Sequence, residues 1–93
     1  MSNSTRTGSI NELRACSWLM SQGYEAFRNV CQVGPADIIA LNTETGEKIL
    51  IDVKTKSKSK VFIYHKLSST QKRLGVKVLI VDENGCTLQE TGD

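Results

Sequence analysis

Two aspartates and a lysine stand inside apolar runs of this chain, where charged side chains are unusual. Asp37 lies in the first run, and Asp52 and Lys54 lie in the second, with fourteen residues between the two aspartates. An isolated charge in a buried strand costs roughly several kcal/mol unless it is paired or bound to a metal. Two carboxylates and a backbone carbonyl near Val53 would supply the oxygen ligands that Mg²⁺ prefers, and Lys54 could orient an attacking water or offset negative charge. These residue types predict metal-assisted hydrolysis of a phosphodiester.

The two apolar runs are expected to be neighbouring strands, over residues 36–41 and 48–54, joined by a hairpin turn that Gly46 closes. A loop symmetric about its centre places Asp37 directly across from Asp52, with the Cβ atoms about 5 Å apart. A bulge at Gly46 would shift this register by one residue. The spacing therefore favours two carboxylates on one face of the sheet.

The remaining elements are predicted from capping residues, periodicity and turn signals. A polar, basic and flexible arm over residues 1–8 precedes a single domain over residues 9–93, whose first helix opens with a capping box at Ser9 and Glu12. The further expected elements are a helix over 10–22, strands over 24–30, 60–65, 76–82 and 86–90, and a short helix over 68–74. This alternation indicates one layered α/β domain.

The charge of the chain is distributed unevenly. The net charge is +2, but residues 48–77 carry nine basic side chains against one acidic one, a local net charge of +8. A basic block beside a carboxylate site fits a polyanion such as nucleic acid. The alternative is that these lysines only solvate an edge strand and its loop.

Several classes of protein are disfavoured by composition. No apolar run approaches the roughly 20 residues that span a bilayer, and the N-terminus lacks the apolar centre of a signal peptide. We therefore expect a soluble, cytoplasmic protein with no membrane partner. The three cysteines form no C-x-x-C pair, so a zinc site is disfavoured and reduced cysteines with a packing role are expected.

The ordered motifs resemble the PD-(D/E)XK nuclease superfamily, and within it the archaeal-type Holliday-junction resolvases. The resemblance rests on Pro35-Ala36-Asp37, on Asp52-Val53-Lys54, and on Gly8 followed four residues later by Glu12. The stretch from Gly23 to Arg28 is similar to the passage that follows the first helix in those enzymes. The resemblance covers roughly residues 6–82. Asp52 stands where resolvases usually have Glu, and the chain is shorter than theirs.

The resemblance implies an αβββαβ core in which helices flank a central mixed sheet, a homodimer, and DNA cleavage that needs Mg²⁺ or Mn²⁺ but no small-molecule cofactor. Carried over by position, Glu12, Asp37 and Asp52 would be metal ligands, beside the Val53 carbonyl inferred above from the strand itself, and Lys54 would be catalytic. Gln71 would lie near the site. Arg6 and Thr7 would match the arm that approaches the DNA backbone. Apart from the resemblance, the lysine comb Lys56, Lys58 and Lys60 lies beside the proposed site, which favours contact with phosphates.

Structural roles remain open for the same residues. Glu12 could simply complete the capping box, Asp37 and Lys54 could form an exposed cross-strand ion pair, and Gln71 could be an ordinary helix residue.

The leading hypothesis is a metal-dependent endodeoxyribonuclease, with a structure-selective role in recombination, repair or replication as its closest form. A sequence-specific endonuclease of restriction or homing type is a second form, although 93 residues leave little room for a separate recognition module. The rivals are a catalytically silent nucleic-acid-binding module and a small structural subunit.

Overall fold

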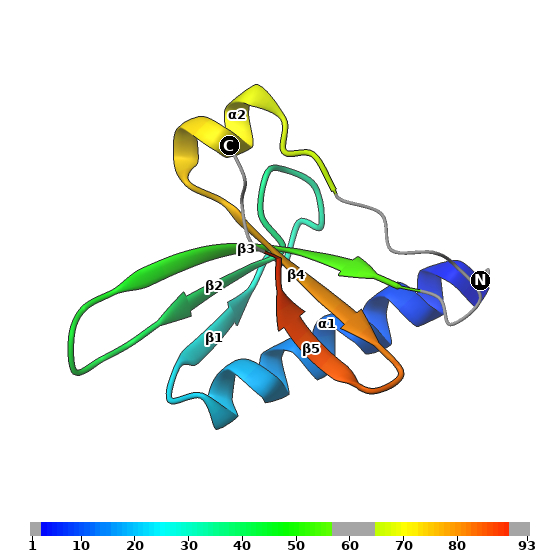
Figure 1. Cartoon of the computed structure of the whole chain (residues 1–93), viewed down its shortest axis with the longest axis horizontal. Coiled ribbons are helices and arrows are strands. Elements are labelled where there is room, and N and C mark those ends of the chain that lie inside the picture. The colour runs from blue at the N-terminus through cyan, green and yellow to red at the C-terminus, as the bar shows by residue number, and fades with distance from the viewer. Residues whose placement is uncertain (1–2, 57–64, 90–93) are drawn as a thin grey trace.

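The computed structural model describes residues 3–56 and 65–89, which form a small α/β domain (Figure 1). Its elements, in chain order, are α1 (Asn3–Ser21), β1 (Glu25–Arg28), β2 (Ile38–Leu41), β3 (Lys48–Thr55), α2 (Ser69–Leu74), β4 (Lys77–Asp82) and β5 (Gly85–Leu88). The described strands make one mixed sheet in the order β1-β2-β3-β4-β5, in which β3 and β4 are parallel and the other described pairings are antiparallel. The predicted α/β class is confirmed.

The first helix begins at Asn3, not at residue 10 as predicted. Residues 3–8 are therefore helical, and Ser9 and Glu12 lie inside α1 where they cannot form a capping box. The physical reason is that no proline interrupts this segment and Gly8 does not adopt a positive φ, so the helical hydrogen bonds continue past Ser9.

The core lies between α1 and one face of the sheet. α1 runs across the strands and packs against all five of them (Figure 1). The central buried side chains are Ala15, Cys16 and Leu19 of α1 with Ile38, Ala40, Ile51, Leu79 and Val81 of the sheet. Apolar residues at helical spacing, including Ile10, Leu13 and Met20, predict the buried face of this helix only in part, because these three are at least half exposed while the polar Asn11 is buried.

The other face of the sheet is covered unevenly. β4 is buried on both faces, whereas Phe27 on β1 is 51% exposed and Ile39 on β2 is 42% exposed. α2 has no buried residue and lies apart from α1 (Figure 1). The strand predicted over 60–65 lies outside the described residues except for His65, which is not in a strand.

The predicted hairpin of β2 and β3 is confirmed with its register. Leu41 pairs with Lys48 and Ile38 pairs with Ile51, so the loop adds no residue to either strand. Gly46 closes the turn with a φ of 79° and donates its backbone N–H to the carbonyl of Asn42 at 2.7 Å. Gly46 therefore closes the loop without the register shift that a bulge there would cause.

The three cysteines are free, but they differ in burial. Cys16 belongs to the core and Cys86 packs against it, as predicted. Cys31 is exposed in the β1–β2 loop, so a packing role is wrong for this residue. In the described part of the chain, no helix is long and apolar enough to cross a membrane.

Candidate active site

Asp37 occupies a β-bulge at the start of β2. Its backbone N–H donates to the carbonyl of Ile51 at 2.8 Å, although Ile51 is already the register partner of Ile38. Asp37, directly before β2, and Ile38 thus both face Ile51 of β3, which is the arrangement of a bulge, and bulges redirect side chains. The Asp37 carboxylate accepts the backbone N–H of Val53 at 2.7 Å. The bulge therefore places the carboxylate of Asp37 where a backbone carbonyl would otherwise accept the hydrogen bond of the Val53 N–H.

Asp52 and Lys54 lie two residues apart on β3 and share the face that points away from the buried Ile51. The Lys54 Nζ lies 3.5 Å from Asp52 Oδ2, and the Asp52 side chain is only 15% exposed against 44% for Lys54. The carboxylate of Asp52 is thus largely buried against the sheet, while the side chain of Lys54 is exposed to solvent. The plain ion pair weighed for Lys54 therefore exists, but with Asp52 and not with Asp37.

Gln71 connects α2 to the site. Its Oε1 accepts the backbone N–H of Ser68 at 2.9 Å and the Ser68 hydroxyl accepts the backbone N–H of Gln71, a reciprocal capping box. Its Nε2 donates to the carbonyl of Pro35 at 3.0 Å, two residues before Asp37. Gln71 also contributes a hydrogen bond that lowers the pKa of Asp52. One side chain therefore links the helix end, the loop that carries Asp37, and Asp52.

The electrostatics of Asp52 reflect this crowding. Burial raises the pKa of its carboxyl above the ordinary value of 3.8, and the positive charge of Lys54 lowers it in part. The charge of Asp37 and a hydrogen-bonding contact with it raise the pKa further. Two carboxylates held this close favour a bound cation or proton, because either relieves their repulsion.

Val53 contributes backbone groups to the same place. Its N–H points toward β2, since it donates to the carboxylate of Asp37. In an antiparallel ladder the N–H and C=O of one residue face the same neighbouring strand, so the carbonyl of Val53 also faces that side. β2 begins only at Ile38, which leaves the predicted carbonyl ligand at the edge where the carboxylates gather.

Glu12 is not gathered with the other acids. It lies on α1, where its Oε1 pairs with Arg28 Nη2 at 3.0 Å. Arg28 is the register partner of Ile38, and the next residue, Asn29, donates its backbone N–H to the carbonyl of Asp37. The backbone of Arg28 therefore lies near that of Asp37 across neighbouring strands, but its guanidinium occupies the carboxylate of Glu12, the predicted third metal ligand. Among the described residues, no group of three or more His, Cys, Asp or Glu side chains is placed to hold a metal ion.

Polar contacts fix α1 against the strand that carries the site. The buried Asn11 donates through Nδ2 to Thr55 Oγ1 at 2.9 Å, at the end of β3. Arg14 donates to Asn11 Oδ1 at 3.2 Å and to the carbonyl of Asp82 at 2.6 Å. Sequence reasoning missed Asn11, Arg14 and Arg28, because a polar residue on a helix or an edge strand carries no local sign of its distant partner.

The residues implied in DNA binding are dispersed. Arg6 and Thr7 are exposed on the first turns of α1 and do not form a separate arm. Lys56 follows β3 directly and donates its backbone N–H to the carbonyl of Val81 at 2.9 Å. Lys58 and Lys60 lie outside the described residues. The structure thus brings together Asp37, Asp52, Lys54, Gln71 and Val53 of the predicted set.

Comparison of the chain with protein-family models, with curated proteins and with solved structures found no match in any of the three.

Proposed function

We propose that this protein is a metal-dependent endonuclease that hydrolyses DNA phosphodiester bonds. The observation that supports this most strongly is the convergence of Asp37, Asp52 and Lys54, with the Gln71 amide beside them, at the edge where β2 begins. Phosphodiester hydrolysis needs ligands for a cation and a positive charge near the phosphate, and these residues offer both.

The donor set fits a hard divalent cation. Mg²⁺ is typically held by one or two carboxylates and keeps several waters, which the carboxylates of Asp37 and Asp52 with the carbonyl of Val53 would allow. A bound cation would polarise the phosphate and lower the pKa of a water. The exposed amine of Lys54 would orient that water or stabilise developing negative charge. Gln71 would hold the Asp37 loop and Asp52 in place.

Glu12 belongs to the proposal as a third acid only if its ion pair with Arg28 opens. Both side chains are partly exposed, 24% for Glu12 and 35% for Arg28. Exposed ion pairs of this kind are worth roughly 0–1 kcal/mol, so a cation could compete for the carboxylate. We therefore assign Asp37 and Asp52 as the principal ligands and Glu12 as a conditional one.

The element order supports the proposed kinship with PD-(D/E)XK nucleases. Among the described residues, α1, three strands, α2 and β4 follow one another as αβββαβ, with β5 added at the end. The resolvase-like form adds a homodimer and a branched DNA substrate, both of which are proposals that the experiments below address.

A catalytically silent binding module is the second candidate, and one observation favours it. Arg28 neutralises Glu12, so the described residues assemble two acids where the resemblance implies three.

The test is a cleavage assay with Mg²⁺, Mn²⁺ or EDTA on linear duplex, single-stranded, nicked, flapped and four-way junction DNA. Asp52→Asn, prepared in the same way, controls for contaminating nucleases. Metal-dependent cutting that the variant lacks would support the nuclease, and the best substrate would identify its form. Binding of DNA without cutting on any substrate would favour the silent module.

A further inference from the structure

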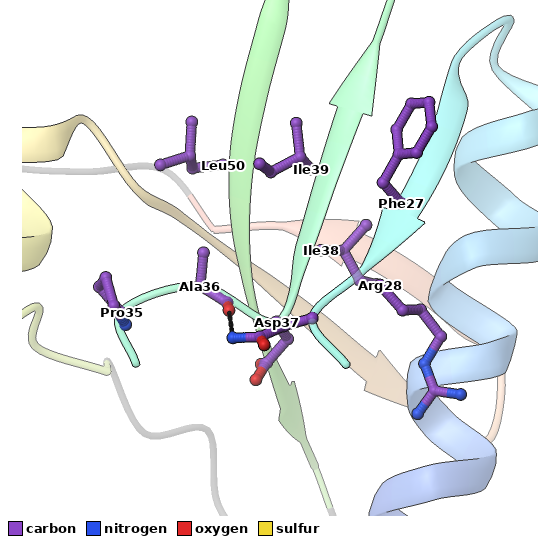
Figure 2. A pocket seen from close by; sticks show the side chains of 9 residues that line it. Phe27, Arg28, Pro35, Ala36, Asp37, Ile38, Ile39 and Leu50 are labelled. Carbon is purple, nitrogen blue, oxygen red and sulfur yellow. Dashed lines mark hydrogen bonds between the residues drawn. The ribbon is translucent and has the colours of Figure 1, made fainter. Parts of the chain in front are cut away.

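A shallow apolar pocket lies on the sheet face that α1 leaves uncovered. It has a volume of about 320 Å³, and Phe27, Ile39 and Leu50 form a row across it. These three are register partners on β1, β2 and β3, so they share one face. Figure 2 shows the row along one part of the lining and Asp37 at the other end.

The side chain of Asn29 holds the loop that forms the far wall of this pocket, and Gln71 adds its hydrogen bond to the carbonyl of Pro35. Asn29 Nδ2 donates to the carbonyls of Val33 and Ala36, at 2.9 and 3.0 Å. Its Oδ1 accepts the backbone N–H groups of Cys31 and Gln32, at 3.0 and 3.2 Å. All the polar atoms of this amide are therefore engaged in fixing the loop that presents Pro35 and Ala36 to the pocket. The Asn29 side chain thus fixes the wall through four hydrogen bonds.

The pocket is continuous with the candidate active site. Asp37 lines it, and Leu50 precedes Asp52 by two residues on the same face of β3. Two residues of a strand span about 7 Å. A phosphate at the carboxylates would therefore lie beside the apolar row, and a single nucleotide is long enough to bridge the two.

We propose that this pocket receives an unstacked nucleobase next to the phosphate that is cleaved. This inference rests on the proposed function and specifies its substrate class. The half-exposed ring of Phe27 offers a stacking surface, and stacking on an aromatic ring tolerates any base. A base inside a continuous duplex is already stacked on both faces. The pocket therefore selects single strands, flaps or branch points over intact duplex.

A second copy of the chain is the competing occupant. A stable interface uses about 20–30 residues on each side. The row contributes three large apolar side chains, and its boundary carries the charged Asp37, while the guanidinium of Arg28 is directed toward Glu12 on α1. The small apolar area and the charged border fit one base better than an interface between copies.

The experiment begins by mapping the position of cleavage on the best substrate of the wild-type protein. The nucleotide on each side of that position is then replaced by an abasic one. We expect cleavage efficiency to fall about 5- to 150-fold for one of the two positions, the range that base–aromatic stacking supplies. In Phe27→Ala the same abasic replacement should have little further effect, because the stacking partner is already absent. Phe27→Leu, which keeps apolar volume and loses the ring, guards against a folding defect.

Met20→Ala is the matched control, because Met20 is similarly exposed, 58%, but lies on α1 away from the pocket. An abasic effect of equal size in wild type and in both Phe27 variants would overturn the nucleobase proposal while leaving the nuclease intact. The nucleobase proposal would also be overturned if a change in oligomeric state were the only effect of Phe27→Ala. That result would assign the pocket to a second copy of the chain.

A binding readout separates this inference from the nuclease proposal. A 2-aminopurine in a short single-stranded oligonucleotide brightens when it leaves its stacked neighbours. Wild type should raise this fluorescence on binding, and Phe27→Ala should raise it less. Absence of cleavage together with this fluorescence difference between wild type and Phe27→Ala would refute only the nuclease proposal. A protein that binds no oligonucleotide would refute both proposals.

Discussion

The carboxylate of Asp37 accepts the backbone N–H of Val53 at 2.7 Å, across the point where β2 begins. The same side chain therefore replaces a ladder hydrogen bond and supplies half of the acidic pair. Its structural and chemical roles can be separated by substitution, because an amide can accept a hydrogen bond but carries no charge.

Asp37→Asn and Asp37→Ala should differ in stability but not in activity. Alanine leaves the partly buried N–H of Val53 without a partner, which costs about 1–3 kcal/mol, whereas asparagine keeps an acceptor. Both variants lose a charged ligand, so cleavage should fall more than about 100-fold in each. Urea denaturation with parallel cleavage assays checks this. Equal stability losses would show that the hydrogen bond contributes little to the fold.

Asp52→Asn should stabilise the protein at neutral pH. Because burial raises the pKa of Asp52 above 3.8, the folded state binds the proton more tightly than the unfolded chain. Above both pKa values the charged carboxylate therefore lowers the free energy of unfolding, and this cost disappears as the pH falls through the raised folded pKa toward 3.8. The gain from the substitution should shrink over the same window. The loss of the partly exposed ion pair with Lys54 offsets only a small part of it.

The measurement is a series of urea denaturations of wild type and Asp52→Asn from neutral to acid pH. Glu44→Gln, in the exposed hairpin loop, should leave the pH dependence unchanged. A gain for Asp52→Asn that is constant across pH would mean that proton binding at this carboxyl is not its source.

Glu12→Gln and Arg28→Gln should have opposite effects on metal affinity. Removing the carboxylate of Glu12 should weaken Mg²⁺ binding about 10-fold, while removing Arg28 frees that carboxylate and should strengthen it. Each should change the free energy of unfolding by less than about 1 kcal/mol, because the pair is partly exposed. Mg²⁺ titration by calorimetry tests both. Unchanged affinity in both variants would make the pair purely structural.

The hairpin and the second helix could be predicted because their determinants are local. The loop around Gly46 fixes the register by itself, and Ser68 with Gln71 forms a capping box within four consecutive residues. That register brings the side chain of Asp37 near that of Asp52, as predicted, but the backbone of Asp37 bonds to Ile51 and not to Asp52 directly across from it. The bulge at Asp37 was not predicted there, since it depends on a hydrogen bond to Ile51 across the sheet.

The face of α1 could not be predicted from apolar spacing. Ile10 and Leu13 fit the helical period, yet Asn11 is the residue that turns inward. The cost of burying Asn11 is offset by its hydrogen bonds with Thr55 and Arg14. Thr55 is distant in the sequence and Arg14 is polar, so neither partner contributes to the apolar periodicity of the helix. The same reasoning applies to Glu12, whose partner on β1 is set by the packing of α1 and not by the helix sequence.

Gly8→Ala should raise the free energy of unfolding by about 0.5–1 kcal/mol. Gly8 lies inside α1 without a positive φ, and an added Cβ would meet nothing within 4 Å. Alanine therefore reduces the entropy lost on folding without a steric cost. Gly46→Ala, at a φ of 79°, should destabilise instead. Thermal denaturation compares the two. Cleavage lost in a stabilised Gly8→Ala would assign Gly8 to DNA contact.

Replacement of the lysine comb by Lys56→Gln, Lys58→Gln and Lys60→Gln together should flatten the salt dependence of DNA binding. Each phosphate contact contributes roughly 0.7–0.9 to the slope of log affinity against log salt concentration, so three contacts would contribute about 2 to 3. Lys48→Gln, at the hairpin end of β3, is the matched control and should leave the slope unchanged. Binding is measured in the Asp52→Asn background, so that the DNA stays intact. An unaltered slope in the triple variant would mean that these lysines only solvate the surface, and the source of DNA affinity would have to be sought elsewhere on the basic block of residues 48–77.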